Sequence, residues 1–136
     1  DSMVPLPQFS TMDGVSIQAT LPGDEIDAIN HRTQHGGAEI VNLLKTGSAF
    51  YAPSAAAVAM AKSILRNERR LLPCAAYLDG QYGLEGIYMG VPCVLGTNGV
   101  EHIVDLELDD AGREKLNASA VAIRADIETL KTKGLL

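Results

Sequence analysis

The sequence lacks the features that nucleic acid or a membrane would require. Its 136 residues carry 17 acidic and 11 basic side chains, a formal net charge of −6, and the basic residues form no cluster. A surface that neutralises backbone phosphates needs such a cluster, so nucleic acid is not an expected partner. No apolar run approaches the roughly 20 residues that span a bilayer, and no secretory signal opens the chain. We therefore expect a soluble cytoplasmic protein without a membrane partner.

Cysteine is also scarce. Cys74 and Cys93 both lie within apolar segments. This favours the interpretation that they are small buried hydrophobic residues in a reducing compartment, and it leaves undecided whether they form one disulfide. The composition, 46% hydrophobic and 21% charged, is typical of a folded globular protein. The length suits one domain, which we expect to cover residues 1–136. The chain begins at Asp1 rather than at Met, so we expect a processed chain or a fragment of a longer one.

The first third of the sequence predicts an irregular entry followed by a helix. Three prolines among the first 22 residues exclude a long helix there, and one short strand is expected at residues 15–19. Acidic residues then open a segment with apolar residues at helical spacing, which predicts a helix over residues 24–45. Gly36 and Gly37 interrupt this pattern and predict a bend or a close packing contact.

A corner of small residues at 45–54 separates this helix from a second one, expected over residues 53–66. Gly47 is suited to end the first helix in a left-handed conformation, and Pro53 is suited to begin the second. Between them lies the hydroxyl of Ser48. Such a corner can hold a polar group against a ligand, although most helix connections only join helices. The second helix is rich in alanine, which fits either tight packing within one domain or a subunit contact.

The remaining sequence predicts strands and a final helix. Strands are expected at residues 71–78, 87–89, 91–95 and 103–108. They follow one another through turns, which favours an antiparallel sheet. Asp109 or Asp110 is expected to cap the last helix, whose apolar stripe recurs at steps of three and four residues. The order of elements predicts an α+β fold with helices packed on a mainly antiparallel sheet.

The residues contain no complete active-site motif. His31 and His35 stand four apart on one predicted helix face and could chelate zinc. Arg32 stands where the catalytic motif has a glutamate, however, and no third ligand is nearby, so a solvated helix face is favoured and no metal is expected. His102 suggests no role. The glycine pattern of a dinucleotide site, a P-loop and a serine-hydrolase elbow are all missing.

Short motifs throughout the chain carry a family resemblance. They occupy residues 36–41, 44–53, 72–76, 80–83, 90–92 and 96–100, together with the opening residues 1–7. In order and spacing they resemble the C-terminal half of malate dehydrogenases of the bacterial, lactate dehydrogenase-like type. The resemblance implies an oxidoreductase of the tricarboxylic acid cycle, in which an N-terminal Rossmann domain binds NAD. This chain would be the C-terminal domain that completes the substrate site.

The resemblance also implies roles for particular residues. Ser48 would lie beside the substrate and the nicotinamide, Ala52 or Pro53 would lie near the nicotinamide face, and Asp1 would flank the catalytic histidine. That histidine would precede Asp1, so no catalytic residue is assigned and the chain by itself is expected to be inactive. The implied partners are the missing Rossmann domain, a dicarboxylate substrate and further copies of the chain in a homo-oligomer.

Two other interpretations remain open. The substrate-selecting loop of the family precedes this segment, so the C-terminal domain of a lactate dehydrogenase fits as well. Alternatively, the chain is a non-catalytic module that associates with itself through its alanine-rich helix.

Overall fold

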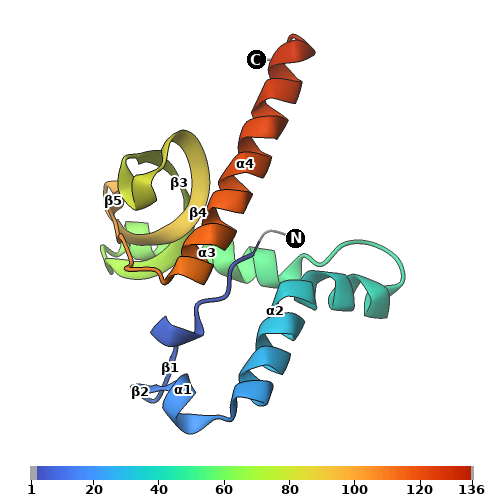
Figure 1. Ribbon diagram of the computed structural model, residues 1–136, viewed down its shortest axis with the longest axis vertical. Coiled ribbons are helices and arrows are strands. Elements are labelled where there is room, and N and C mark those ends of the chain that lie inside the picture. Colours follow the sequence, from blue (N-terminus) through green and yellow to red (C-terminus); the bar gives the residue numbers. More distant parts are fainter. Residues whose placement is uncertain (1–2, 136) are drawn as a thin grey trace. The chain divides into compact units, whose positions relative to one another are not determined.

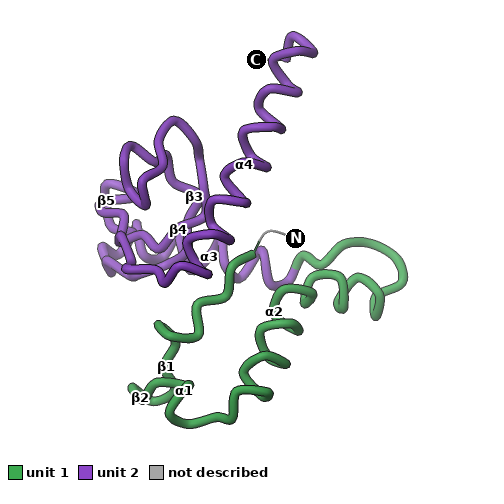
Figure 2. Tube along the Cα trace, viewed as in Figure 1, with its two compact units in different colours: residues 1–50 green, residues 51–136 purple. Residues whose placement is uncertain are grey.

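The computed structural model describes residues 3–135. The chain forms two compact units, Asp1–Phe50 and Tyr51–Leu136 (Figure 2). None of the helices between residues 3 and 135 combines the length and the apolarity needed to cross a membrane.

The first unit consists of short elements and one long helix. These are η1 (Pro7–Phe9), β1 (Thr11–Met12), β2 (Val15–Ser16), α1 (Ile17–Thr20) and α2 (Gly23–Leu44). β1 and β2 pair in an antiparallel hairpin. The strand predicted over residues 15–19 is therefore wrong beyond Ser16. The Thr20 hydroxyl donates to the Ser16 carbonyl at 3.0 Å, and Leu21 N–H donates to the Ile17 carbonyl at 2.9 Å, which closes a helical turn instead.

Helix α2 runs through its two glycines without a break. Apart from the helix's own backbone, no atom lies within 4 Å of the position that a Cβ would take at Gly36 or Gly37, so neither glycine serves a close packing contact. Figure 1 shows α2 changing direction in its second half, which agrees with the predicted bend. Among the described residues of α2 only Ile26 is buried, and the apolar side chains near its C-terminal end, such as Leu43 at 74%, are exposed.

The predicted ends of the two helices at the corner differ from the observed ends by one residue for the first helix and two for the second. α2 ends at Leu44, where Lys45 takes a positive φ of 63° and donates its N–H to the Val41 carbonyl at 3.0 Å. Gly47 does adopt a left-handed φ of 91°, but it lies beyond the helix. Helix α3 (Tyr51–Leu65) begins two residues before Pro53. Proline is tolerated there because N–H groups of the first helical turn have no partner within the helix.

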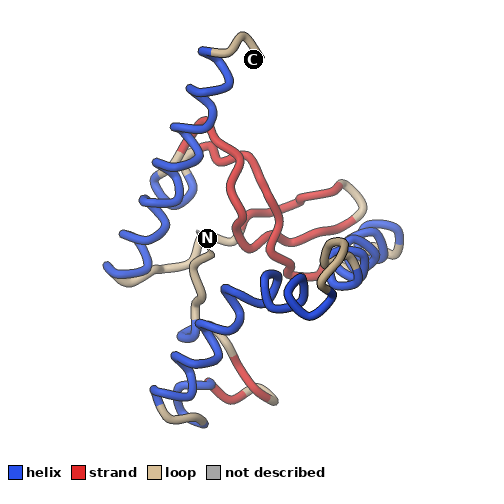
Figure 3. Tube along the Cα trace, turned by 90° about the vertical axis from the view of Figure 1, so that its right-hand side faces the viewer, coloured by secondary structure: helices blue, strands red, loops and turns tan. Residues whose placement is uncertain are grey.

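The second unit contains a three-stranded sheet in the order β3-β4-β5 (Figure 3). Its elements are α3, β3 (Arg70–Asp79), η2 (Gln81–Gly83), β4 (Glu85–Gly96), β5 (Gly99–Ile103) and α4 (Asp110–Thr132). Both pairings are antiparallel. The α+β prediction is confirmed.

Two strand predictions in this unit are wrong. Residues 87–89 and 91–95 belong to one strand, β4, which continues through Pro92. Proline has no N–H, but the Pro92 carbonyl still accepts the N–H of Val104 at 2.8 Å. The strand predicted over 103–108 ends in fact at Ile103. Residues 104–108 keep the alternation of half-buried and exposed side chains outside the sheet.

Helix α4 matches its predicted start and its apolar stripe. The Asp109 carboxylate accepts the N–H of Gly112 at 2.7 Å, as an N-cap does. Leu116 and Ala120 are buried, whereas Leu130, further along the same stripe, is 40% exposed. Ile123 and Ile127 are partly buried against the same core. The C-terminal part of α4 projects past the strands of this unit (Figure 1), which agrees with the exposure of Leu130.

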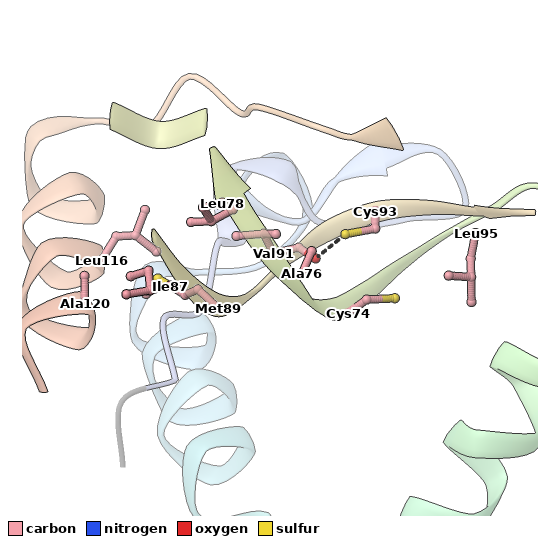
Figure 4. Packing of buried hydrophobic residues seen from close by; sticks show 10 residues of the cluster. All are labelled: Cys74, Ala76, Leu78, Ile87, Met89, Val91, Cys93, Leu95, Leu116 and Ala120. Carbon is pink, nitrogen blue, oxygen red and sulfur yellow. Dashed lines mark hydrogen bonds between the residues drawn. The ribbon is translucent and has the colours of Figure 1, made fainter. Parts of the chain in front are cut away.

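The core of the second unit lies between β3, β4 and α4 (Figure 4). Its buried members are Cys74, Ala76, Leu78, Ile87, Met89, Val91, Cys93, Leu95, Leu116 and Ala120. Both cysteines are free thiols, so the disulfide that the sequence left open is not formed and the prediction of small buried hydrophobes is confirmed. Burial, followed by the proximity of Cys74, raises the pKa of Cys93.

Ser63 ties α3 to the sheet. Its side chain is fully buried; its hydroxyl donates to the Leu95 carbonyl at 2.6 Å and accepts the N–H of Arg70 at 3.2 Å. Removing one partner of a buried hydrogen bond leaves the other without compensation for its lost hydration, at a cost of about 1–3 kcal/mol. Ser63 therefore links a helix to strands that are distant in sequence.

Ser63→Ala should lower the free energy of unfolding of the second unit by about 1–3 kcal/mol, for that reason. All four tyrosines of the chain lie in this unit and tryptophan is absent, so tyrosine fluorescence during urea unfolding reports on this unit. Ser54→Ala, at an exposed position of the same helix, is the matched control and should change stability by less than about 0.5 kcal/mol. Equal effects of the two substitutions would contradict the role of Ser63.

Candidate functional site

The corner between α2 and α3 presents Ser48 to solvent. Residues 48–50 have irregular backbone, and the Ser48 side chain is exposed. Lys45 and Gly47 both have positive φ, and Thr46 N–H donates to the Leu44 carbonyl at 2.7 Å. The tight turns that follow α2 therefore place a small hydroxyl-bearing side chain on the surface, where it is available to a ligand.

The resemblance also implied roles for Ala52 and Asp1. Ala52 is exposed in the first turn of α3. The boundary between the compact units falls between Phe50 and Tyr51, so Ser48 belongs to the end of the first unit and Ala52 to the start of the second. Asp1 lies outside the described residues.

The histidine pair of α2 does form a contact. The His31 and His35 rings are stacked, with centroids 4.4 Å apart and planes inclined by 26°. Within residues 3–135 no group of three or more metal-binding side chains comes together. His102 lies on β5 and lines a surface cavity of about 530 Å³ together with Tyr77 and Tyr88, two rings in edge contact with centroids 5.3 Å apart.

An ion pair on α2 was not anticipated from the sequence. Arg32 binds Glu39 through two contacts, Nε to Oε2 at 3.0 Å and Nη2 to Oε1 at 2.9 Å. These hydrogen bonds, and then the positive charge of Arg32, hold the pKa of Glu39 below its usual value. The pair spans two helical turns, from one side of Gly36 and Gly37 to the other. The spacing of seven residues, about two helical turns, was the sequence feature from which the pair could have been predicted.

The lowered pKa of Glu39 determines how the contribution of this ion pair to stability depends on pH. Because the Glu39 pKa is lower in the folded chain, its stabilising contribution is present above the ordinary glutamate pKa. The contribution is lost as the pH falls through the lowered value. Both side chains are exposed to solvent, so water and salt screen the pair and keep its contribution small.

Tyr82 has a structural role in the second unit, and no reaction is assigned to it. Its hydroxyl donates to the Val104 carbonyl at 2.5 Å and accepts the N–H of Leu106 at 3.3 Å. Burial is the main cause that raises the pKa of this phenol, so it stays protonated and able to donate. It lines a cavity of about 350 Å³ whose polar residues include Asp105 and Arg113. The sequence indicated only a turn here.

Residues 5–133 match the family model described as lactate/malate dehydrogenase, alpha/beta C-terminal domain. The chain belongs to this family. The match extends over both compact units, and it confirms the resemblance inferred from the motifs.

The curated relatives of this dehydrogenase-family chain include two similar malate dehydrogenases. The one from Roseiflexus castenholzii is 54% identical over 131 residues, covering 96% of this chain and 42% of the relative. The one from Methanosarcina barkeri is 55% identical over 131 residues, covering 96% of this chain and 43% of the relative. The chain thus spans about two-fifths of the length of these relatives.

Solved structures of the family share the fold. Malate dehydrogenase from Salinibacter ruber is 42% identical with a TM-score of 0.91, covering 98% of this chain and 45% of that one. Lactate dehydrogenase from Eimeria maxima, solved with NADH and oxamate, is 34% identical with a TM-score of 0.88, covering 99% of this chain and 44% of that one. The backbone is therefore common to both kinds of enzyme.

Proposed function

We propose that this chain is the C-terminal part of an NAD-dependent malate dehydrogenase, which interconverts malate and oxaloacetate. The observation that supports the proposal is the identity to curated malate dehydrogenases, which is 54% and 55% over 96% of the chain. Identity to the solved structures does not separate the two enzymes, because malate dehydrogenases at 42% and 32% bracket lactate dehydrogenases at 37% and 34%. The cytoplasm and the tricarboxylic acid cycle are the setting that this proposal implies.

The chain would contribute one wall of the active site. A Rossmann domain elsewhere in the parent protein would bind NAD, which would supply the acceptor for the hydride from C2 of malate. The sequence contains no glycine-rich dinucleotide loop for the pyrophosphate. Ala52 is small and exposed in the first turn of α3, so it leaves room for a flat ring. The residues of this chain thus fit contact with the nicotinamide ring only, and we assign the rest of the cofactor to the other domain.

Ser48 is the residue of this wall that we assign to the substrate. A serine hydroxyl both donates and accepts hydrogen bonds, so it can bind the hydroxyl of malate or the carbonyl of oxaloacetate. A hydroxyl needs an adjacent histidine or carboxylate to move a proton, so Ser48 is not assigned the role of the base. Its role is to position the substrate, and the proton carrier is assigned to the segment before Asp1.

The test uses the full-length parent protein. It should reduce oxaloacetate with NADH much faster than pyruvate, and Ser48→Ala should lower kcat/KM for oxaloacetate by up to about tenfold, the value of one hydrogen bond of about 0.5–1.5 kcal/mol. Ser10→Ala, which removes an exposed hydroxyl outside the corner and α3, should leave kcat/KM unchanged. Faster turnover of pyruvate would replace the proposal with a lactate dehydrogenase, and equal effects of the two substitutions would remove Ser48 from the site.

Self-association is a second part of the proposal. Residues 51–58, the first two turns of α3, are exposed, and Tyr51 and Val58 have exposed fractions of 77% and 52%. Contiguous apolar surface of this kind is usually covered by another protein surface. We assign it to contacts in a homo-oligomer of the parent enzyme, in which case the alanine-rich helix serves assembly rather than chemistry.

A further inference from the structure

Two imidazoles are held together on the exposed surface of α2. His31 and His35 lie one turn apart, and their ring centroids are 4.4 Å from each other. We propose that this pair is a chelating site for a divalent transition-metal ion of the group that imidazole prefers, namely copper(II), nickel(II) or zinc. The proposal is independent of the dehydrogenase reaction, because neither histidine has a part in it.

The hydrogen bond of His35 points to the atom that would bind the metal. Its Nδ1 lies 2.8 Å from the His31 carbonyl oxygen. A carbonyl oxygen only accepts, so Nδ1 carries the proton and donates it. In a neutral imidazole the lone pair is then on Nε2. Histidine ligands in metal sites commonly use a backbone carbonyl in this way to fix the tautomer and the ring.

The ring separation suits one ion bound by both histidines. A metal–nitrogen bond of about 2.0–2.1 Å puts two ligating nitrogens about 3.3–3.4 Å apart at a tetrahedral angle. The ring centroids are 4.4 Å apart, so the two imidazoles are close enough for rotation of the side chains to bring one nitrogen of each ring to that separation. Residues 3–135 offer no cluster of three metal-binding side chains. Water would therefore fill the remaining positions, and the ion would exchange readily.

The position of the histidine pair on α2 implies that a bound ion would affect the stability of the helix. His35 directly precedes Gly36 and Gly37, and the Arg32–Glu39 ion pair spans these glycines. The Glu39 carboxylate neutralises Arg32, which reduces the repulsion between Arg32 and a nearby cation. The two rings come together one helical turn apart, so an ion bound to both stabilises this turn of α2, where glycine weakens the following turn.

The proposal is tested by titrating the untagged chain with nickel(II) chloride in a calorimeter. The wild type should bind one ion, and His31→Asn and His35→Asn should each weaken binding at least tenfold, since the second imidazole binds intramolecularly once the first is attached. His102→Asn, which removes the third histidine of the chain, is the matched control and should leave the affinity within about twofold of wild type. Magnesium(II), which prefers oxygen ligands, should not compete.

Two results would overturn it. If either His31→Asn or His35→Asn bound nickel as tightly as the wild type, the ion would be held by single imidazoles and not by the pair. If His102→Asn weakened binding as much as the other two, the site would not be on α2. Both histidines of the pair are exposed, so the variants should fold, and far-UV circular dichroism of each variant verifies that the helix content is retained.

Discussion

Leu78→Ala should lower the free energy of unfolding of the second unit by about 2–5 kcal/mol. Leu78 is fully buried on β3 and pairs with Ile87 on β4. The substitution removes three buried carbon atoms and leaves a cavity that the surrounding strands and α4 can fill only in part. A typical domain is stable by about 5–15 kcal/mol, so this loss is a large fraction of the total. Urea unfolding followed by tyrosine fluorescence measures it.

The same strand supplies the matched control. Leu71 is also a leucine of β3, but it lies on the opposite face and is 60% exposed. Leu71→Ala removes the same atoms without opening a buried cavity, so its effect should stay within about 0.5 kcal/mol. Comparable losses at the two positions would show that the face carrying Leu71 is covered in solution, and the assignment of the core to the other face would be wrong.

The 136-residue chain assayed by itself should show no NAD-linked oxidation of malate, although it carries Ser48. This expectation rests on the proposed function. The sequence has no dinucleotide loop, and its histidines lie on α2 and β5, whereas the proposal assigns the proton carrier to the other domain of the parent protein. Without a site for the hydride acceptor or for the base, the loss should be complete. The ultraviolet absorbance of NADH measures it.

The control is the full-length parent protein under the same conditions. Activity of the parent together with an inactive 136-residue chain is the expected result. Turnover by the 136-residue chain would show that it holds a complete site and would contradict the division of labour between two domains. A parent protein that reduces neither oxaloacetate nor pyruvate would instead refute the proposed function, whatever the chain does by itself.

The sequence-based predictions are correct where an element depends on neighbouring residues, and they fail where it depends on pairing with a distant segment. The cap at Asp109 is correct because it depends on residues 109–112 alone. The two strands predicted at 87–89 and 91–95 are one, because Gly90 and Pro92 weaken a local pattern that pairing with β3 restores. The strand predicted at 103–108 fails for the converse reason. Its alternation is real, but β5 pairs with β4 only as far as Ile103.

The candidate site shows the same limit. The residues alone placed Ser48 on a corner between two helices, and only the family resemblance linked it to a substrate. The Arg32–Glu39 pair was within reach of a helical-wheel argument, because it depends on one helix. Ser63 was not, since its partner Leu95 is 32 residues away. The contact exists only once α3 meets the sheet.

The sequence by itself determined the α+β class, the antiparallel order of the strands, the burial of both cysteines and the family. Each of these depends on local periodicity or on motifs with a specific spacing. The tertiary structure decided where the last strand ends and which serine holds α3 to the sheet. These features depend on pairing and hydrogen bonds between segments that are distant in sequence.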